Sequence, residues 1–167
     1  TSARAAALGR VRGDVVDLPA EALSPASIAV LASLGQGVVE VRRRPVVAIV
    51  STGNELVAPG ETLGSGQIHD ANTAALAAAT IEAGAQPIVY PAVPDQPAAI
   101  DAALRRAADE ADLLVVSGGV SVGRHDHVRT ALERLGELAF WRVAVQPGKP
   151  LAFGSIAGRP LIGLPGN

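Results

Sequence analysis

The residues best suited to chemistry lie between Ser117 and Asp126, in the stretch SGGVSVGRHD. An apolar run precedes this stretch and a helical pattern follows it. A strand, a glycine-rich loop and a helix in this order can bind an anion through backbone N–H groups. The residues that permit close backbone approach or add a hydroxyl are Gly118, Gly119, Ser121 and Gly123. The same stretch is also compatible with an ordinary tight turn in which Asp126 caps the helix.

Two further carboxylates follow predicted strands. Glu55 comes after the β-branched run 46–50, and Asp95 follows a strand predicted at 87–90. Because strands joined by right-handed βαβ crossovers are parallel, their carboxyl ends meet at one edge of the sheet. Glu55, Asp95 and Asp126 are therefore expected along that edge, where acids beside a glycine loop suit Mg²⁺ and a bound anion. Each acid alone could instead be a helix cap or a solvated turn residue.

Strands and helices alternate from Pro45 onward, which predicts an α/β domain. Strands are predicted at 46–50, 87–90, 112–116 and 139–145, with a hairpin formed by 151–154 and 159–164. Helices are predicted at about 71–83, 97–109 and 127–135, and an irregular loop at 57–67. The continuous apolar strands are typical of a sheet that is buried on both faces.

Residues 1–44 are interpreted as a linker and the edge of a preceding domain, and residues 45–167 as the main domain. Ser24 and Pro25 predict a helix start, Gly35 predicts its end, and Val38–Val41 predicts a short strand. The chain begins with Thr, contains no Met, and ends in a strand-end turn. We therefore expect a fragment of a longer protein.

Composition excludes several classes of protein. The 167 residues are 49% hydrophobic and 18% charged, as in a globular protein. The net charge of −2 offers no basic field for nucleic acid. No apolar run is long enough to span a membrane and no signal pattern is present, so a soluble cytoplasmic protein is expected. Without cysteine there is no disulfide or thiolate metal site, and the spacing of His69, His125 and His127 matches no common metal site.

Other polar positions have both structural and functional interpretations. Asp70 or Asn72 could cap the helix that follows them. Lys149, in the loop QPGKP, could bind an anion as a point charge or could be an exposed turn lysine.

Taken together, six segments resemble the molybdopterin molybdenumtransferase family, which includes bacterial MoeA and the gephyrin E domain. They are STGNELVAPGE (51–61), GQIHDAN (66–72), VPD (93–95), SGGVSVGRHD (117–126), QPGKPLAFG (146–154) and GLPGN (163–167). The segments follow the order and spacing of that family over residues 45–167, and residues 11–44 resemble its preceding linker. The resemblance implies a three-layer α/β/α sandwich with a mostly parallel sheet, the molybdopterin-binding domain.

The resemblance also implies an activity and its participants. The family uses adenylylated molybdopterin, molybdate and Mg²⁺ to form the molybdenum cofactor, with release of AMP. By motif, Glu55, Asp95 and Asp126 match the acids that serve as catalytic residues and metal ligands. The positions that match substrate-binding residues are Thr52, Gly53, Asn72, Gly118, Gly119, Ser121, Gly123, Lys149 and Pro165. A homodimer of the full-length protein is implied, and the molybdopterin adenylyltransferase is a possible partner.

The chain departs from the family pattern at two positions. Asn54 replaces an acid that many relatives have, and Gln146 replaces a lysine that some relatives have. Two alternatives remain open at this point. A molybdopterin adenylyltransferase would share the fold, although its loop reads more like GGTG than GGVSVG. A non-catalytic molybdopterin-binding or scaffold fragment would share the binding residues alone.

Overall fold

The computed structural model describes residues 22–119, 127–141 and 151–166. The chain divides into two compact units, Thr1–Arg43 and Arg44–Asn167. None of the described helices combines the length and the apolar character needed to cross a membrane.

The first unit contains helix α2 (Pro25–Ser33), which confirms the predicted helix start. Its N-cap is Ser24, whose Oγ accepts the N–H of Ser27 at 3.1 Å. The strand predicted at Val38–Val41 is wrong. No described strand pairs with residues 38–41, and Val38 is 90% exposed. The apolar side chains of this segment do not make it a strand without a partner.

The second unit is built on a six-stranded sheet with the order β4-β1-β5-β8-β7-β6. The strands are β4 (Gln86–Val89), β1 (Val46–Ser51), β5 (Leu113–Ser117), β8 (Arg159–Leu164), β7 (Ala152–Ile156) and β6 (Gly136–Trp141). The first four strands in this order are mutually parallel, and β7 is antiparallel to both of its neighbours. The predicted hairpin is confirmed, since β7 and β8 are joined by Ala157 and Gly158 with φ of 49° and 75°.

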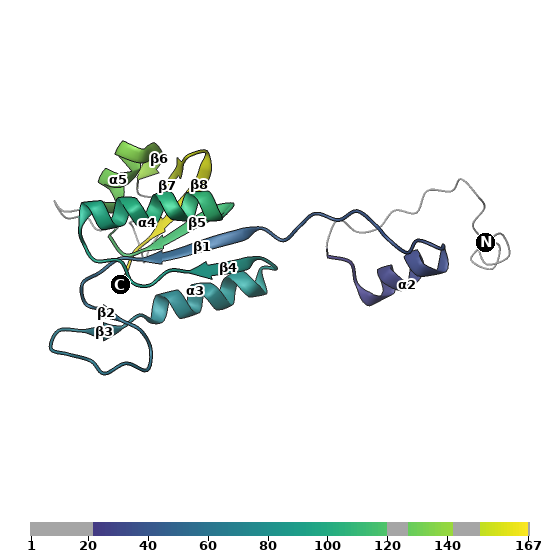
Figure 1. Cartoon of the computed structure of the whole chain (residues 1–167), viewed down its shortest axis with the longest axis horizontal. Helices are drawn as coiled ribbons and strands as arrows, with labels where there is room; N and C mark the ends of the chain where they lie inside the picture. The colour runs from purple at the N-terminus through teal and green to yellow at the C-terminus, as the bar shows by residue number, and fades with distance from the viewer. Residues whose placement is uncertain (1–21, 120–126, 142–150, 167) are drawn as a thin grey trace. The chain divides into compact units, whose positions relative to one another are not determined.

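Helices cover both faces of this sheet, which confirms the expected three-layer α/β/α arrangement (Figure 1). Helices α4 (Pro97–Glu110) and α5 (His127–Leu135) pack together on one face, and α3 (Ala71–Glu82) lies against β1 and β4 on the other. The main apolar cluster lies beneath α4 and α5, and the alternate residues Val47 and Ile49 of β1 are buried on the opposite face. The fully buried side chains of the cluster include Ile100, Leu104, Leu114, Leu132 and Leu161.

Helix α3 is attached to the sheet differently from α4 and α5. None of its residues is fully buried, whereas α4 and α5 each bury several. Its N-cap is Asp70, whose Oδ1 accepts the N–H of Thr73 at 3.0 Å. The Thr73 hydroxyl donates to Asp70 Oδ2 at 2.6 Å and lies 2.5 Å from the hydroxyl of Ser51, at the end of β1. Since Thr73 gives its proton to the carboxylate, Ser51 is the donor to Thr73. Polar contacts thus fix the first turn of α3 to the sheet.

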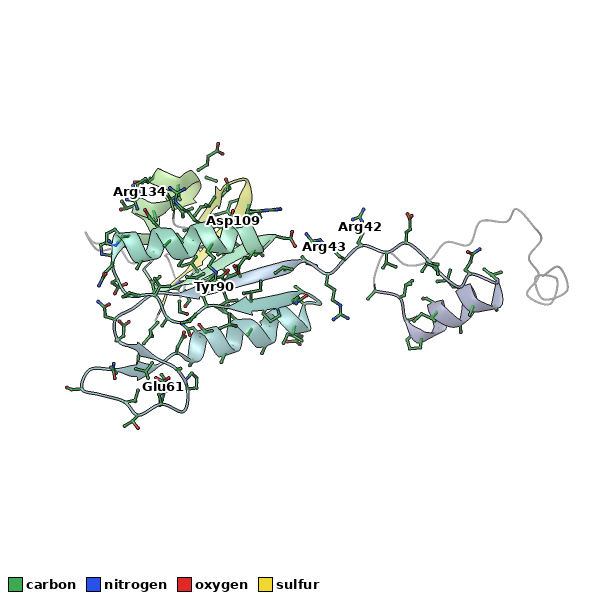
Figure 2. The ribbon with its side chains drawn as sticks, viewed as in Figure 1. Arg42, Arg43, Glu61, Tyr90, Asp109 and Arg134 are labelled. Atoms are coloured by element: carbon green, nitrogen blue, oxygen red, sulfur yellow. The ribbon has the colours of Figure 1, made fainter. Side chains whose placement is uncertain are left out.

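A second, small sheet follows β1. Strands β2 (Leu56–Val57) and β3 (Ile68–His69) pair in parallel, and the loop between them extends away from the main sheet. Glu61 lies in this loop (Figure 2). The irregular loop predicted at 57–67 is therefore correct in its middle, and short strands flank it.

Tyr90 connects the end of β4 to the last turns of α4 (Figure 2). Its ring is buried and its hydroxyl donates to Glu110 Oε2 at 2.6 Å. Arg106 donates to the other carboxylate oxygen of Glu110 at 2.8 Å, and its guanidinium lies 5.5 Å from the centre of the Tyr90 ring. Burial, and then the adjacent Glu110 carboxylate, raise the pKa of Tyr90 to about 12.

This raised pKa predicts a pH dependence of stability. Because the folded pKa of about 12 lies above the ordinary value of 10.0, the stabilising contribution of Tyr90 is complete below pH 10 and is lost as the pH rises towards 12. Tyr90 is the single tyrosine of the chain, so tyrosinate absorbance measures its titration directly.

Two variants control this measurement. Glu110→Gln should lower the titration midpoint, because it removes the charge that opposes ionisation of the phenol. Tyr90→Phe should abolish this part of the pH dependence of unfolding. A midpoint at the ordinary value in the folded protein would contradict the structure.

Candidate functional site

The ends of β1, β5 and β8 lie side by side and form the carboxyl edge of the sheet. The register pairs Ser51 with Ser117 and Ser117 with Leu164. The segment after β4 reaches the same edge, because Gly53 donates its N–H to the Val93 carbonyl at 3.1 Å. The predicted meeting of these loops at one edge is therefore confirmed for the described residues.

The turn Gly118–Gly119 is held close to the end of β1. Both residues have positive φ, 87° and 63°. A Cβ atom on Gly118 would lie 2.4 Å from the Thr52 carbonyl oxygen, and one on Gly119 would lie 2.6 Å from the Val128 side chain. Only glycine fits both positions without displacing the backbone or the packed helix. The N–H of Gly118 donates to the Leu164 carbonyl at 3.1 Å, so the turn is also tied to β8.

Thr52 places an unsatisfied hydroxyl beside this turn. The residue is 3% exposed, and its Oγ1 has no hydrogen-bond partner in the described parts of the chain. A Cβ on Gly119 would lie 2.8 Å from Oγ1, so the hydroxyl faces the glycine turn. A buried hydroxyl without a partner costs about 1 to 3 kcal/mol, and native structures contain few such groups. Thr52 is therefore a candidate ligand contact on structural grounds.

Asn72 bridges three elements at the carboxyl edge. Its Nδ2 donates to Ser117 Oγ at 3.1 Å and to the Gly166 carbonyl at 2.6 Å. Gly166 follows Pro165 in the turn after β8, and a Cβ added to Gly166 would lie 3.1 Å from Gly118 Cα. The turn after β5 and the turn after β8 are thus in contact, and Asn72 bonds to the last residue of β5 and to the turn after β8.

Two of the three predicted site acids, Glu55 and Asp95, are described and lie on adjoining loops. Glu55 is exposed, and its carboxylate folds over Gly53, where an added Cβ would lie 2.7 Å from Oε1. The Oδ1 of Asn54 accepts the N–H of Asp95 at 3.1 Å and so joins the loop after β1 to the loop after β4. Asp95 is not a helix cap, because α4 has Gln96 as its N-cap without a side-chain bond.

Four of the predicted site residues lie outside the described residues: Ser121, Gly123, Asp126 and Lys149. The assignment of Glu55, Asp95 and Asp126 as one metal site therefore stays a prediction. Within 22–119, 127–141 and 151–166, no three His, Asp or Glu residues are grouped so that they could hold a metal ion. His69 Nδ1 lies 3.3 Å from the Ala58 carbonyl oxygen, next to the β2–β3 loop.

Sequence reasoning missed the residues that support the site. Ser51 and Ser117 end neighbouring strands, and both serines are buried and bonded to α3. Their position as the last residue of an apolar run was the available signal. The bridging role of Asn54 and the contact of Asn72 with Gly166 had no local signal, because they join residues 41 and 94 positions apart.

Together, the sheet and its carboxyl edge define a class: a three-layer α/β domain whose polar loops gather where the parallel strands end. The chain belongs to the family described as "Probable molybdopterin binding domain", whose model matches residues 48–167. The family resemblance indicated by the motifs is thereby confirmed.

Relatives and solved structures agree. The chain is 41% identical over 156 residues to the molybdopterin molybdenumtransferase of Haemophilus influenzae, covering 93% of this chain and 39% of that protein. It is 44% identical over 155 residues to the protein of the same name from Nostoc sp., covering 90% and 36%. The crystal structure of a molybdopterin biosynthesis MoeA protein from Pyrococcus horikoshii superimposes with a TM-score of 0.79 at 39% identity, covering 88% of this chain and 36% of that one. The chain thus spans well under half the length of these relatives.

The glycine turn predicts a specific loss of stability. Gly118→Ala should destabilise the protein by about 2 to 4 kcal/mol, because it combines a left-handed backbone with overlap of the Thr52 carbonyl. Gly158→Ala is the matched control, since Gly158 has a φ of 75° but no atom within 4 Å of an added Cβ. It should cost about 1 kcal/mol. Equal losses in urea unfolding would show that the close approach at Gly118 is not tight.

A substitution at Thr52 is expected to stabilise the protein, whereas the substitution at Gly118 destabilises it. Thr52→Val keeps the shape of the side chain and removes the unsatisfied hydroxyl, so it should raise the free energy of unfolding by about 1 kcal/mol in the absence of ligand. Thr80→Val is the control, because the Thr80 hydroxyl donates to the Leu76 carbonyl at 2.7 Å. A stability loss for Thr52→Val as large as that for Thr80→Val would mean that the Thr52 hydroxyl is satisfied in solution.

Proposed function

We propose that this chain is the molybdopterin-binding part of a molybdenum insertase, an enzyme of molybdenum cofactor biosynthesis. The full enzyme would transfer molybdate to adenylylated molybdopterin and release AMP. Family membership and the names of the curated relatives support this proposal. The observation that carries it for this chain is the buried Thr52 hydroxyl, which lies beside the Gly118–Gly119 turn and has no partner among the residues that the structure describes.

The carboxyl edge would bind the anionic part of the substrate. The N–H of Gly118 is already bonded to Leu164, so Gly119 is the first backbone donor of the turn that could reach a phosphate oxygen. The Thr52 hydroxyl would supply a further hydrogen bond. Fixed donors of this kind need no reorganisation during the reaction. Ser121, Gly123 and Lys149 would add a hydroxyl, a close backbone approach and a positive charge from the neighbouring loops.

Glu55, Asp95 and Asp126 are proposed as the catalytic acids and the ligands of Mg²⁺. Carboxylate oxygens are the ligands that Mg²⁺ prefers. The bond from Asp95 N–H to Asn54 supports a shared site for the first two acids, because it keeps their loops adjacent. When bound, Mg²⁺ would offset phosphate charge and polarise the phosphoanhydride. Asn54 would keep an oxygen at a position where many relatives have an acid. In the structure this oxygen accepts the N–H of Asp95.

Three further parts of the proposal concern the whole protein. Because the chain spans 39% and 36% of two relatives, other domains would complete the active site. A homodimer of the full-length protein and transfer of substrate from the molybdopterin adenylyltransferase are proposed on the family resemblance. A cytoplasmic location likewise stays a prediction.

Titration of adenylylated molybdopterin into this chain, followed by calorimetry with and without Mg²⁺, tests the proposal. Binding that strengthens with Mg²⁺ is expected. Thr52→Val should weaken the binding about tenfold, the value of one lost hydrogen bond to a charged group, and Thr80→Val should leave it unchanged. Absence of binding by the unaltered chain would overturn the proposal that this edge is sufficient for binding.

The alternatives give different results in companion experiments. An adenylyltransferase would transfer AMP from ATP to molybdopterin, which the proposed insertase would not. A scaffold fragment would bind without any effect of Mg²⁺.

A further inference from the structure

The first turn of α3 is bonded to the carboxyl edge through Asn72. The two hydrogen bonds from Asn72 Nδ2, to Ser117 Oγ and to the Gly166 carbonyl, are called the Asn72 bridge here. Ser117 immediately precedes Gly118, and Gly166 lies against Gly118 Cα. The bridge therefore bonds to the residue before the glycine turn and to the turn that packs on it.

The chemistry of the acceptors fixes the orientation of the Asn72 amide. A backbone carbonyl can only accept, so the group 2.6 Å from the Gly166 oxygen must be the amide nitrogen. Both hydrogens of Nδ2 are then used, one on each acceptor. Only Oδ1 remains for another contact. A ligand that used the Asn72 N–H would have to break the bridge.

Polar contacts hold the first turn of α3, and with it Asn72, against the ends of the strands. No side chain of α3 is buried, whereas its first turn is fixed by the Asp70 cap and by the bond between Thr73 and Ser51. Ser51 and Ser117 are neighbours in the sheet register. The helix start, the ends of β1 and β5 and the turn after β8 thus form one hydrogen-bonded unit.

We propose that Asn72 is a positioning residue, which keeps the Gly118–Gly119 turn in its ligand-binding shape through Ser117 and Gly166. It acts on binding through this turn and not by donating to the ligand. The choice of ligand rests on the proposed function, whereas the effect on the turn does not.

Hydrogen exchange without ligand tests the positioning role. In Asn72→Asp the carboxylate cannot donate to the Gly166 carbonyl, so the Gly118 N–H, bonded to Leu164, should exchange about tenfold faster. The Tyr90 N–H, bonded to Ile49 at 3.0 Å, is the internal reference for any general loss of stability. Thr80→Val, on the same helix, should leave the ratio of the two rates unchanged. An unchanged ratio in Asn72→Asp would overturn the proposal.

Binding of adenylylated molybdopterin provides the second readout. Asn72→Asp should raise the Kd about tenfold at neutral pH. The difference from the unaltered chain should narrow as the pH approaches the ordinary aspartic acid pKa of about 3.9, because the protonated acid regains a donor. Asn72→Ala, which cannot regain one, should show no narrowing.

The two readouts separate this proposal from the proposed function. Faster exchange at Gly118 with an unchanged Kd would overturn the positioning role in binding. If the unaltered chain binds no adenylylated molybdopterin, the proposed function fails, and the exchange ratio still decides whether Asn72 positions the turn.

Discussion

The alignment of β1, β5 and β8 is the constraint on which the rest of the site depends. Parallel pairing in register brings Ser51, Ser117 and Leu164 to the same level, so three loops begin at one edge. The buried side chains beneath α4 and α5 hold this alignment from one face, and the buried Val47 and Ile49 hold it from the face that α3 covers. A shift of one residue in any of these strands would exchange its two faces and separate the serines from α3.

The two faces of the sheet differ in how the helices are attached to them. The face under α4 and α5 contains the main apolar core, including Ile100 and Leu104. The face under α3 uses hydrogen bonds at the strand ends, where Ser51 and Ser117 contact the helix start. Directional bonds specify position more closely than apolar contacts do. The strand ends on the α3 face are thus suited to setting the geometry of a binding edge.

Much of this organisation could be predicted from local sequence, and some of it could not. The apolar run 46–50 and the Ser24–Pro25 helix start gave correct elements, because their signals lie within a few residues. Val38–Val41 has the composition of a strand but lacks a partner, and local sequence does not report partners. Asp70 and Asn72 were equivalent candidates for the helix cap. The structure separates them, since Asp70 caps α3 while Asn72 reaches Gly166, a contact set only by the tertiary fold.

Two close backbone approaches and a buried hydroxyl lie together at the carboxyl edge. Gly118 and Gly119 adopt left-handed backbone in close contact with Thr52, whose buried hydroxyl has no partner among the described residues. A sequence under selection for stability alone would replace Thr52 with valine, which fills the same space without the desolvated hydroxyl. Strain and unsatisfied polar groups persist where function requires them. The Thr52 hydroxyl and the Gly118–Gly119 turn lie together where the parallel strands end, and this is the physical argument for placing the binding site there.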